Sequence, residues 1–498
     1  MNPGLTAYTQ LVNPSLYQIN TRVLLTSLGR NATLDDIPDS FLDQIASRGF
    51  DWVWLLGVWS VGPTGRFISR SNPQLRNEYR QVLLDLSDAD IGGSPFAITS
   101  YSVDPSFGGE DALARIRERL AKRHIKLLLD FIPNHVAHDH VWVDSHPEYF
   151  IEGTQADRLQ ATDRWVGVHT GRVFALGRDP NFPGWPDTLQ LNYFSAGLRA
   201  AMIGELDSVA ARCDGVRCDM ATLLEPEVFA KTWGSTHGLE GLTMPHFWPD
   251  AIRSTRAKHP HFLFMAEVYW GYEWTLQQHG FDYTYDKTLY DRLLSLRGPE
   301  VHEHLVAPLS YQSKMVRFLE NHDEPRIASK LPFPAHRAAA VLTYLAPGMR
   351  FFFDGQLEGR RVRVPMHLNR APVERANQEI VDLYKALLPV ANSLPLRVGS
   401  WNLLDAQQAW DGNPTHGNFI VYLIEHPLEH LLVVVNYASY RSQCLIRLPG
   451  REWLHSRVEL RDRLTHDRFS HPVEDLTRKG LFVDLPEWGV HLFSLDCV

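Results

Sequence analysis

The heptapeptide Asp214–Met220, which reads D-G-V-R-C-D-M, contains a pair of residues suited to covalent chemistry. It follows a polar, helix-like run, as an inner strand of a β/α unit does. Because side chains alternate along a strand, Arg217 and Asp219 point to the same side. A guanidinium in that position keeps a carboxylate ionised and lowers its pKa. An ionised, oriented aspartate can attack an electrophilic carbon; a structural ion pair at a strand end is the alternative.

Other strand-like runs also end in polar or charged residues. In a parallel β/α barrel the carboxyl ends of the strands meet at one rim, where the chemistry takes place. Four such endings in one chain are hard to explain by solvation alone. They are Asp130 with Asn134 and His135, Arg217 with Asp219, Glu267, and Asn321 with His322 and Asp323.

Two carboxyl groups across a pocket are the equipment for glycoside hydrolysis. Asp219 is the candidate for the ionised nucleophile. Glu267 lies among Phe264, Met265, Val268 and other apolar residues. A carboxyl group in such surroundings, close to another negative charge, has a raised pKa and suits a general acid.

Eight apolar, strand-like runs alternate with helix-like runs over most of the chain, which predicts an α/β fold, a (β/α)8 TIM barrel. The region 57–109 is predicted as a long loop with a short helix at about 77–86. The eight strands are expected near 16–20, 51–56, 125–131, 214–220, 261–267, 280–283, 315–319 and 349–353.

Two segments depart from the barrel pattern. Residues 136–192 lack clear periodicity and are expected to form a small inserted domain after the third strand. From residue 394 onward, short alternating strands predict a C-terminal all-β sandwich domain, 394–498. The barrel would then comprise 1–135 and 193–393.

These motifs together resemble the signature regions of the α-amylase superfamily of glycoside hydrolases, in the family's order and spacing, over roughly residues 15–390. The fold expected from the alternation is also the fold of that family. The matching segments are Asp130–His135, Gly215–Asp219, Glu267 after Met-Ala, Glu320–Asp323, Leu189–Asn192, Gly57–Pro63 and Tyr101–Gly108.

The resemblance implies a retaining mechanism and assigns roles to individual residues. Asp219 would be the nucleophile, Glu267 the acid and then the base, and Asp323 the third carboxylate that grips sugar hydroxyls. The substrate-binding residues would be Arg217, His135, His322, Asp130 and Phe96. Phe96 stands where the family usually has a stacking tyrosine, so it can stack but cannot donate a hydrogen bond.

Departures from the family pattern limit the range of substrates that we expect. Many endo-acting amylases carry Lys-His after the nucleophile, whereas this chain has Thr222 and Leu223. We therefore expect a short α-glucoside as substrate in place of a long polymer. No cofactor is expected; calcium stays open, because Asn134 is the one residue that matches a family calcium ligand.

Composition limits the classes of partner. The chain has 498 residues and a net charge of -9, so a nucleic-acid partner is not expected. Four cysteines without a metal-ligand spacing suggest a reducing compartment. With no signal-like or membrane-spanning run, we expect a cytoplasmic protein whose partner is a small carbohydrate.

Several alternatives remain open. A transglycosylase or phosphorolytic enzyme of the same family would use a sugar, polyol or phosphate as the acceptor, and a catalytically inactive interaction protein is a remote possibility. His135, His138 and His140 do not have the spacing of a standard metal site. The segment Gly62–Gly65 with Arg66 and Arg70 lacks the ending of a phosphate loop, so a flexible rim loop is preferred. Arg360, Arg361 and Arg363 are expected to be solvated or salt-bridged.

Overall fold

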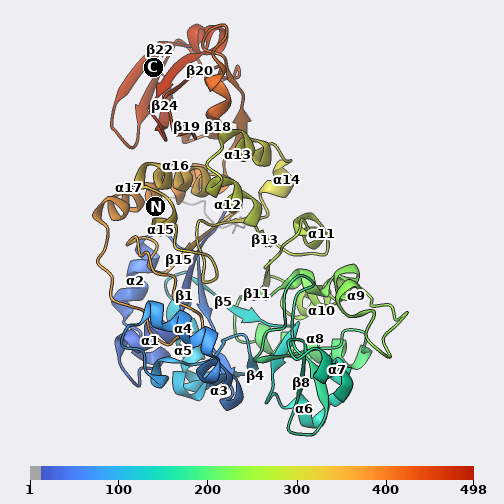
Figure 1. Cartoon of the computed structure of the whole chain (residues 1–498). Coiled ribbons are helices and arrows are strands. Elements are labelled where there is room, and N and C mark those ends of the chain that lie inside the picture. Colours follow the sequence, from blue (N-terminus) through green and yellow to red (C-terminus); the bar gives the residue numbers. More distant parts are fainter. Residues whose placement is uncertain (1–12, 498) are drawn as a thin grey trace.

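The computed structural model describes residues 13–497, and its centre is a closed barrel of eight parallel strands (Figure 1). The order around the barrel is β1-β15-β14-β13-β12-β11-β5-β2. This confirms the predicted (β/α)8 barrel. The strands are β1 (Ser15–Asn20), β2 (Trp52–Leu56), β5 (Lys126–Phe131), β11 (Gly215–Cys218), β12 (Leu263–Ala266), β13 (Tyr283–Tyr285), β14 (Met315–Arg317) and β15 (Met349–Phe353).

Helices surround the barrel and bury their apolar faces against it. In α5, for example, Leu113, Ile116 and Leu120 recur at helical spacing and are buried, as predicted. The principal helices are α1 (Thr21–Leu28), α2 (Asp39–Ser47), α5 (Gly109–Ala121), α8 (Ala196–Ala210), α10 (Trp248–Lys258), α12 (Lys287–Leu294), α16 (Phe333–Tyr344) and α17 (Gln378–Ala391). Shorter helices are α9 (Pro226–Trp233), α11 (Glu273–Gln278), α13 (Gly298–Leu305), α14 (Leu309–Gln312) and α15 (Ile327–Lys330).

The region 57–109 is more ordered than the sequence predicted. It contains β3 (Trp59–Val61), α3 (Pro63–Ser71), α4 (Pro73–Val82) and β4 (Ile98–Val103). Each helix begins with a proline, whose fixed φ suits the first helical position. The Asn72 side chain also accepts hydrogen bonds from two backbone N–H groups at the start of α4. The prolines therefore begin helices here, and the prediction of a flexible loop at Gly62–Gly65 was wrong.

The stretch that we propose as the inserted domain, 136–192, has its own small sheets. The strand β6 (His135–Ala137) pairs antiparallel with β10 (Thr188–Gln190). The three-stranded sheet comprises β7 (Glu152–Gly153), β9 (Val173–Ala175) and β8 (Trp165–Gly167), accompanied by α6 (Trp142–Ser145) and α7 (Gln155–Gln160). His135 thus starts the first strand after the barrel strand β5.

After the short helix α18 (Leu394–Val398), which the sequence did not predict, the chain forms antiparallel sheets of six and three strands. Their apolar faces share one core that includes Val421 and Val434 from one sheet and Cys444 and Val483 from the other. This is the predicted all-β C-terminal region. Its strands are β16 (Ser400–Leu404), β17 (Ala406–Gln407), β18 (Phe419–His426), β19 (Glu429–Asn436), β20 (Ser442–Ile446), β21 (Arg457–Asp462), β22 (Arg468–Pro472), β23 (Leu481–Leu485) and β24 (Val490–Cys497).

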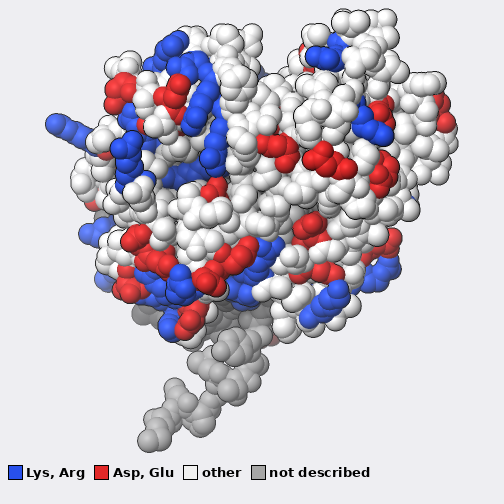
Figure 2. Space-filling model, turned by 90° about the horizontal axis from the view of Figure 1, so that it is seen from below, with Lys and Arg blue, Asp and Glu red and all other residues white. Residues whose placement is uncertain are grey.

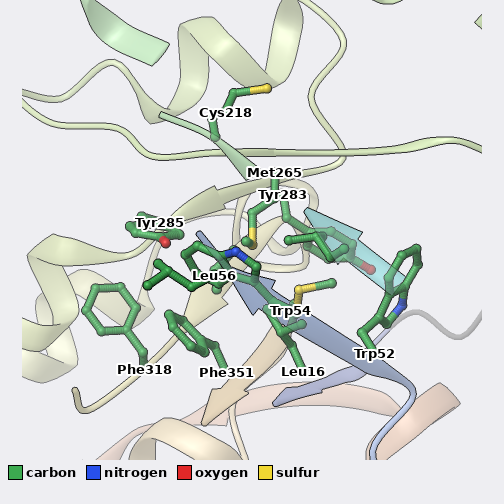
Figure 3. Packing of buried hydrophobic residues seen from close by; sticks show 14 of the residues in the cluster. Leu16, Trp52, Trp54, Leu56, Cys218, Met265, Tyr283, Tyr285, Phe318 and Phe351 are labelled. Carbon is green, nitrogen blue, oxygen red and sulfur yellow. The ribbon is translucent and has the colours of Figure 1, made fainter. Parts of the chain in front are cut away.

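Aromatic side chains fill the inside of the barrel. Trp54, Tyr285, Phe318 and Phe351 lie close together (Figure 3). The ring centre of Tyr285 lies 5.4 Å from that of Phe318 and 6.1 Å from that of Phe351. Such pairs each contribute about 0.5–1.5 kcal/mol beyond the burial of their area. They pack inside the barrel next to the polar strand endings, and Trp54 contacts Arg217.

Among the described residues, no helix combines the length and the hydrophobicity needed to cross a lipid bilayer. Residues 1–12, on which the expectation about an N-terminal signal partly depends, lie outside the described residues.

Candidate active site

The strand register brings the predicted polar endings to one part of the rim. Arg217 on β11 lies opposite Asp130 on β5 and Met265 on β12. Cys218 lies opposite Ala266, so the residues that follow them, Asp219 and Glu267, are neighbours. Arg217 and Asp219, on one side of β11, therefore lie next to the residues on the same side of the adjacent strands.

One guanidinium binds both candidate carboxylates. Nη1 of Arg217 donates to Oδ1 of Asp219 at 2.5 Å, and its Nη2 lies 2.7 Å from Oε2 of Glu267. The side chain of Arg217 is 1% exposed. Because the two carboxylates bind the two terminal nitrogens of one planar group, they lie side by side at the same rim. That proximity is what a double-displacement mechanism requires of its two carboxyl groups.

Two aromatic rings hold the guanidinium of Arg217 in place. Its central carbon lies 5.4 Å from the ring centre of Trp54 and 5.1 Å from that of Phe96. A cation close to an aromatic face is attracted to the electrons of the ring. Phe96 also lies 5.5 Å from the ring of His322. Phe96 therefore lies at the site, as expected, while Trp54 is a contributor that the sequence did not single out.

Glu267 is buried and accepts hydrogen bonds at both oxygens. Its Oε2 accepts from the backbone N–H of Met220 at 2.6 Å, and its Oε1 accepts from the hydroxyl of Tyr269 at 2.9 Å. Met220 has a φ of 45°, a conformation that costs energy for a non-glycine residue and aims its N–H at Glu267. Sequence reasoning missed Tyr269, although its position two residues after Glu267 predicts the same side of an extended chain.

Burial raises the pKa of Glu267, the direction that the sequence predicted. Arg217 opposes the shift, whereas the negative charges of Asp219 and Asp323 add to it. For Asp219 the sequence predicted a lowered pKa. The guanidinium does pull the pKa of Asp219 down, but burial of the carboxyl group is the larger effect, and the net shift is upward. That prediction was wrong because the sequence does not reveal how deeply the pair is buried.

Asp323 lies on the open side of the site, with 32% of its side chain exposed. The side chain of Asn321 accepts the backbone N–H groups of Asp323 and Glu324, which fixes the turn after β14. The amide of Gln18 donates to Nδ1 of His322 at 2.9 Å, and this leaves Nε2 to carry the proton, 3.1 Å from Oδ2 of Asp323. Burial lowers the pKa of His322 to about 3, so this imidazole is neutral.

His135 and Asp130 lie on the other side of Arg217. Nε2 of His135 is 3.9 Å from Oδ2 of Asp219, its ring contacts that of Trp185, and burial lowers its pKa to about 3. Asp130 is fully buried, and its Oδ2 accepts the N–H of Gly57 at 2.9 Å while Oδ1 lies 3.8 Å from Nη1 of Arg217. We therefore propose that Asp130 positions Arg217 from behind instead of binding substrate.

The surroundings of Asn134 do not fit a calcium ion. Its amide exchanges hydrogen bonds with the side chain of Gln190, at 3.0 Å and 3.3 Å, so both amides are already satisfied by each other. Calcium prefers six to eight oxygen ligands, several of them carboxylates. Among the described residues, the one group of three His and carboxylate ligands within 4.8 Å of one another is Glu225, His246 and His279. It does not include the histidines at 135, 138 and 140.

The profile of the α-amylase catalytic domain matches residues 96–361, more than half of the chain. The chain belongs to the α-amylase family. The match covers the segment that carries Asp130, Asp219, Glu267 and Asp323.

Curated relatives of this α-amylase family protein have different activities in their names. It is 22% identical over 330 residues to α-amylase MalA of Haloarcula japonica, which covers 65% of this chain and 41% of that one. It is 27% identical over 233 residues to an α-glucosidase of Culex pipiens, covering 43% and 35%. It is 26% identical over 234 residues to an α-1,4-glucan:maltose-1-phosphate maltosyltransferase of Bifidobacterium longum, covering 46% and 25%. The chain thus spans between a quarter and about two fifths of the length of these relatives.

Solved structures share the fold over nearly the whole chain. The maltogenic α-amylase AmyB of Thermotoga neapolitana matches with a TM-score of 0.70 at 19% identity, covering 97% of this chain and 99% of that one. The α-amylase of Geobacillus thermoleovorans, in complex with acarbose, matches with a TM-score of 0.65 at 18% identity, covering 98% and 99%. At this identity, the likeness establishes the architecture alone.

In this family member, the two residues that depart from the pattern of endo-acting amylases are packed inside the protein. Thr222 is fully buried and its hydroxyl accepts the backbone N–H of Tyr269, while Leu223 is 3% exposed. Neither side chain is charged, and both are part of the internal packing next to the site.

Proposed function

We propose that this α-amylase family protein is a retaining glycosidase that acts on short α-glucosides. The observation that carries the proposal is the bridge of Arg217 between Asp219 and Glu267. It holds one carboxylate in a position to attack and the other in a position to protonate the departing oxygen.

In the first step, Oδ2 of Asp219 attacks the anomeric carbon while Glu267 donates its proton to the glycosidic oxygen. The bond to the leaving sugar breaks and a covalent glycosyl-enzyme forms. In the second step, Glu267, now ionised, takes a proton from water as the water attacks the same carbon. Asp219 leaves as a carboxylate, and the product keeps the α configuration.

Tyr269 has a defined part in this cycle. In the resting structure its hydroxyl donates to Oε1 of Glu267. When Oε1 carries the proton, the same hydroxyl can turn and accept, because a phenol both donates and accepts. Asp323 on the open side, with the buried His322 beside it, would contact the hydroxyls of the bound sugar.

The preference for short substrates rests on the buried Thr222 and Leu223. Because neither of these two positions carries a cationic or imidazole side chain, an extended polymer would lack the binding energy that such side chains provide beyond the scissile bond. Transfer to another acceptor is the second candidate, because two of the curated relatives are maltosyltransferases. In that case a sugar, polyol or phosphate would replace water in the second step.

The experiment is a product screen over maltose, sucrose, trehalose and glucosylated polyols, with and without phosphate, in which NMR reads the anomeric configuration. We expect release of α-glucose from at least one of these and poor activity on starch. Release of the β-anomer, or efficient random cleavage inside amylose, would contradict the proposal. A product that appears only when a second sugar, a polyol or phosphate is supplied would favour the transferase.

A further inference from the structure

A hollow of about 350 Å³ lies between α1, α3 and the turn that follows β4, apart from the catalytic carboxylates. Four arginines line it: Arg22, Arg30, Arg66 and Arg70. The view from below shows Lys and Arg side chains gathered around a depression on this face (Figure 2). Two of these arginines are those that the sequence set beside the Gly62–Gly65 segment, and the helix α3 now fixes both on one element.

The positive charge of this hollow is poorly compensated. Asp104 is the one acidic residue in its lining, so four guanidinium groups face one carboxylate. Oδ1 of Asp104 is occupied by the N–H and hydroxyl of Ser106, and Oδ2 lies 3.4 Å from Nη2 of Arg66. A local excess of positive charge is unexpected in a chain whose net charge is -9. It favours an anionic ligand.

Two of the arginines bind carbonyl oxygens, which do not cancel charge. Nη1 of Arg22 donates to the carbonyl of Gly93 at 2.6 Å, and Nε and Nη2 of Arg70 donate to the carbonyl of Ile91. Arg22 is 6% exposed, and burial lowers its pKa to about 10; Asp104 opposes this shift and the nearby Arg66 adds to it. These bonds fix the directions of the guanidinium groups before any ligand arrives.

We propose that this hollow binds a phosphate group, either as free phosphate or as part of a small sugar phosphate. Planar guanidinium groups match the oxygens of a phosphate and bind them with paired hydrogen bonds. Ser106 and Asn369, also in the lining, add neutral polar groups of the kind that orient a ligand. The volume exceeds what one phosphate ion needs, so there is room for an attached sugar.

The position of the hollow places a bound phosphate near the catalytic rim without being part of it. Arg22 comes two residues after Asn20, the last residue of β1. Gly93, whose carbonyl Arg22 binds, precedes by three residues Phe96, whose ring packs on Arg217. The site is therefore separate from Asp219 and Glu267 but linked to them through short stretches of chain.

The test is calorimetric titration of the full chain with inorganic phosphate, glucose 1-phosphate and glucose 6-phosphate at low salt, with sulfate for comparison. We expect one site per chain. Arg66→Ala and Arg70→Ala should each weaken binding by at least ~10-fold, since each removes a charge-assisted hydrogen bond. Arg478→Ala is the matched control, because it removes the same charge from an exposed side chain in the C-terminal region, and it should leave the affinity unchanged.

The comparison of ligands distinguishes free phosphate from a sugar phosphate. Equal affinity for phosphate and its esters would identify the free ion as the ligand, whereas an ester that binds ~10-fold tighter would show that the sugar is also contacted. Binding that survives in Arg66→Ala and Arg70→Ala but disappears in Glu267→Gln would place the ligand in the catalytic site and overturn the proposal. Absence of binding of every phosphate ligand at ~10 mM would overturn it too. The two half-buried arginines are used because substitution of buried Arg22 could disturb folding.

Discussion

Replacing Tyr269 with phenylalanine removes one of the two uncharged donors to Glu267 and leaves the rest of the site in place. The hydroxyl lies 2.9 Å from Oε1 of Glu267, and the backbone N–H of Tyr269, which binds Thr222, is retained in the variant. A hydrogen bond donated to a carboxylate favours the charged form, and such a bond is stronger than one made to the neutral acid. Its loss should therefore raise the pKa of Glu267 further.

The size of the shift follows from the strength of the bond. Hydrogen bonds to charged groups contribute about 1.5–3 kcal/mol, and one pKa unit corresponds to 1.36 kcal/mol. Because the proton-bound form also loses a weaker bond, we expect an upward shift of roughly one unit. The acid must be protonated to work, so the basic limb of the profile of kcat/KM against pH should move upward by that amount.

The assay measures kcat/KM from about pH 4 to pH 10 on the best small α-glucoside. Tyr272→Phe is the matched control: it removes a hydroxyl from the same loop, one that pairs with Glu227 instead of Glu267. Its basic limb should stay in place. A basic limb in Tyr269→Phe that does not move, or that moves toward lower pH, would refute the role given to this hydroxyl.

Three further predictions follow from the same geometry. Asp219→Asn and Glu267→Gln should each lower kcat by roughly 10³-fold or more in a steady-state assay, and unchanged rates would remove the assigned roles. Burial raises the pKa of Asp130 to about 7, so the folded state binds this proton more tightly than the unfolded state does. The contribution of Asp130 to stability is therefore greatest near pH 4 and is lost as the pH rises through 7; denaturant melts should show a flatter dependence for Asp130→Asn over that range. Gly57→Ala should destabilise the fold by about 2 kcal/mol or more, since Gly57 has a φ of +74° and the new Cβ would lie 2.6 Å from a proline carbon; Gly204→Ala, in an open helical position, should be neutral or stabilising in the same melts.

The barrel was predictable because its inner strands are continuous apolar runs between helix-like runs. Runs such as Trp52–Leu56 are covered on both faces and are therefore easy to recognise as strands in the sequence. The sixth strand was placed near 280–283 but lies at Tyr283–Tyr285, as its short length makes its boundaries weakly marked. Helix α3 was missed, and the helix predicted at about 77–86 begins earlier, as α4 at Pro73. A proline in the sequence indicates a break, and only the structure shows that each of these breaks begins a helix.

The parts of the candidate site that depend on neighbouring residues of one strand were predictable from the sequence. Asp219 and Glu267 each carry a local signal, since each ends a buried run. Trp54 and Tyr269 were missed as parts of the site because their roles depend on packing across strands and loops. The direction of the pKa shift of Asp219 was missed for the same reason: local spacing identifies the arginine, whereas the depth of burial is a property of the whole fold.

The balance of charge in the site explains why one arginine can serve two acids with opposite tasks. Asp130, Asp219, Glu267 and Asp323 all lie near Arg217, and the first three are almost fully buried. If all four were ionised, one guanidinium would face four negative charges where burial makes uncompensated charge costly. Burial therefore raises the pKa of each of these carboxyl groups, and the protonation of Asp219, Glu267 and Asp323 is interdependent. Nη1 and Nη2 of Arg217 contact Asp219 and Glu267 directly, so a single positive charge serves both carboxyl groups, and one of them can keep a proton while the other is ionised. Arg217 thus supports the nucleophile by its positive charge. Because that single charge cannot balance all the carboxyl groups, it also allows the acid to keep its proton.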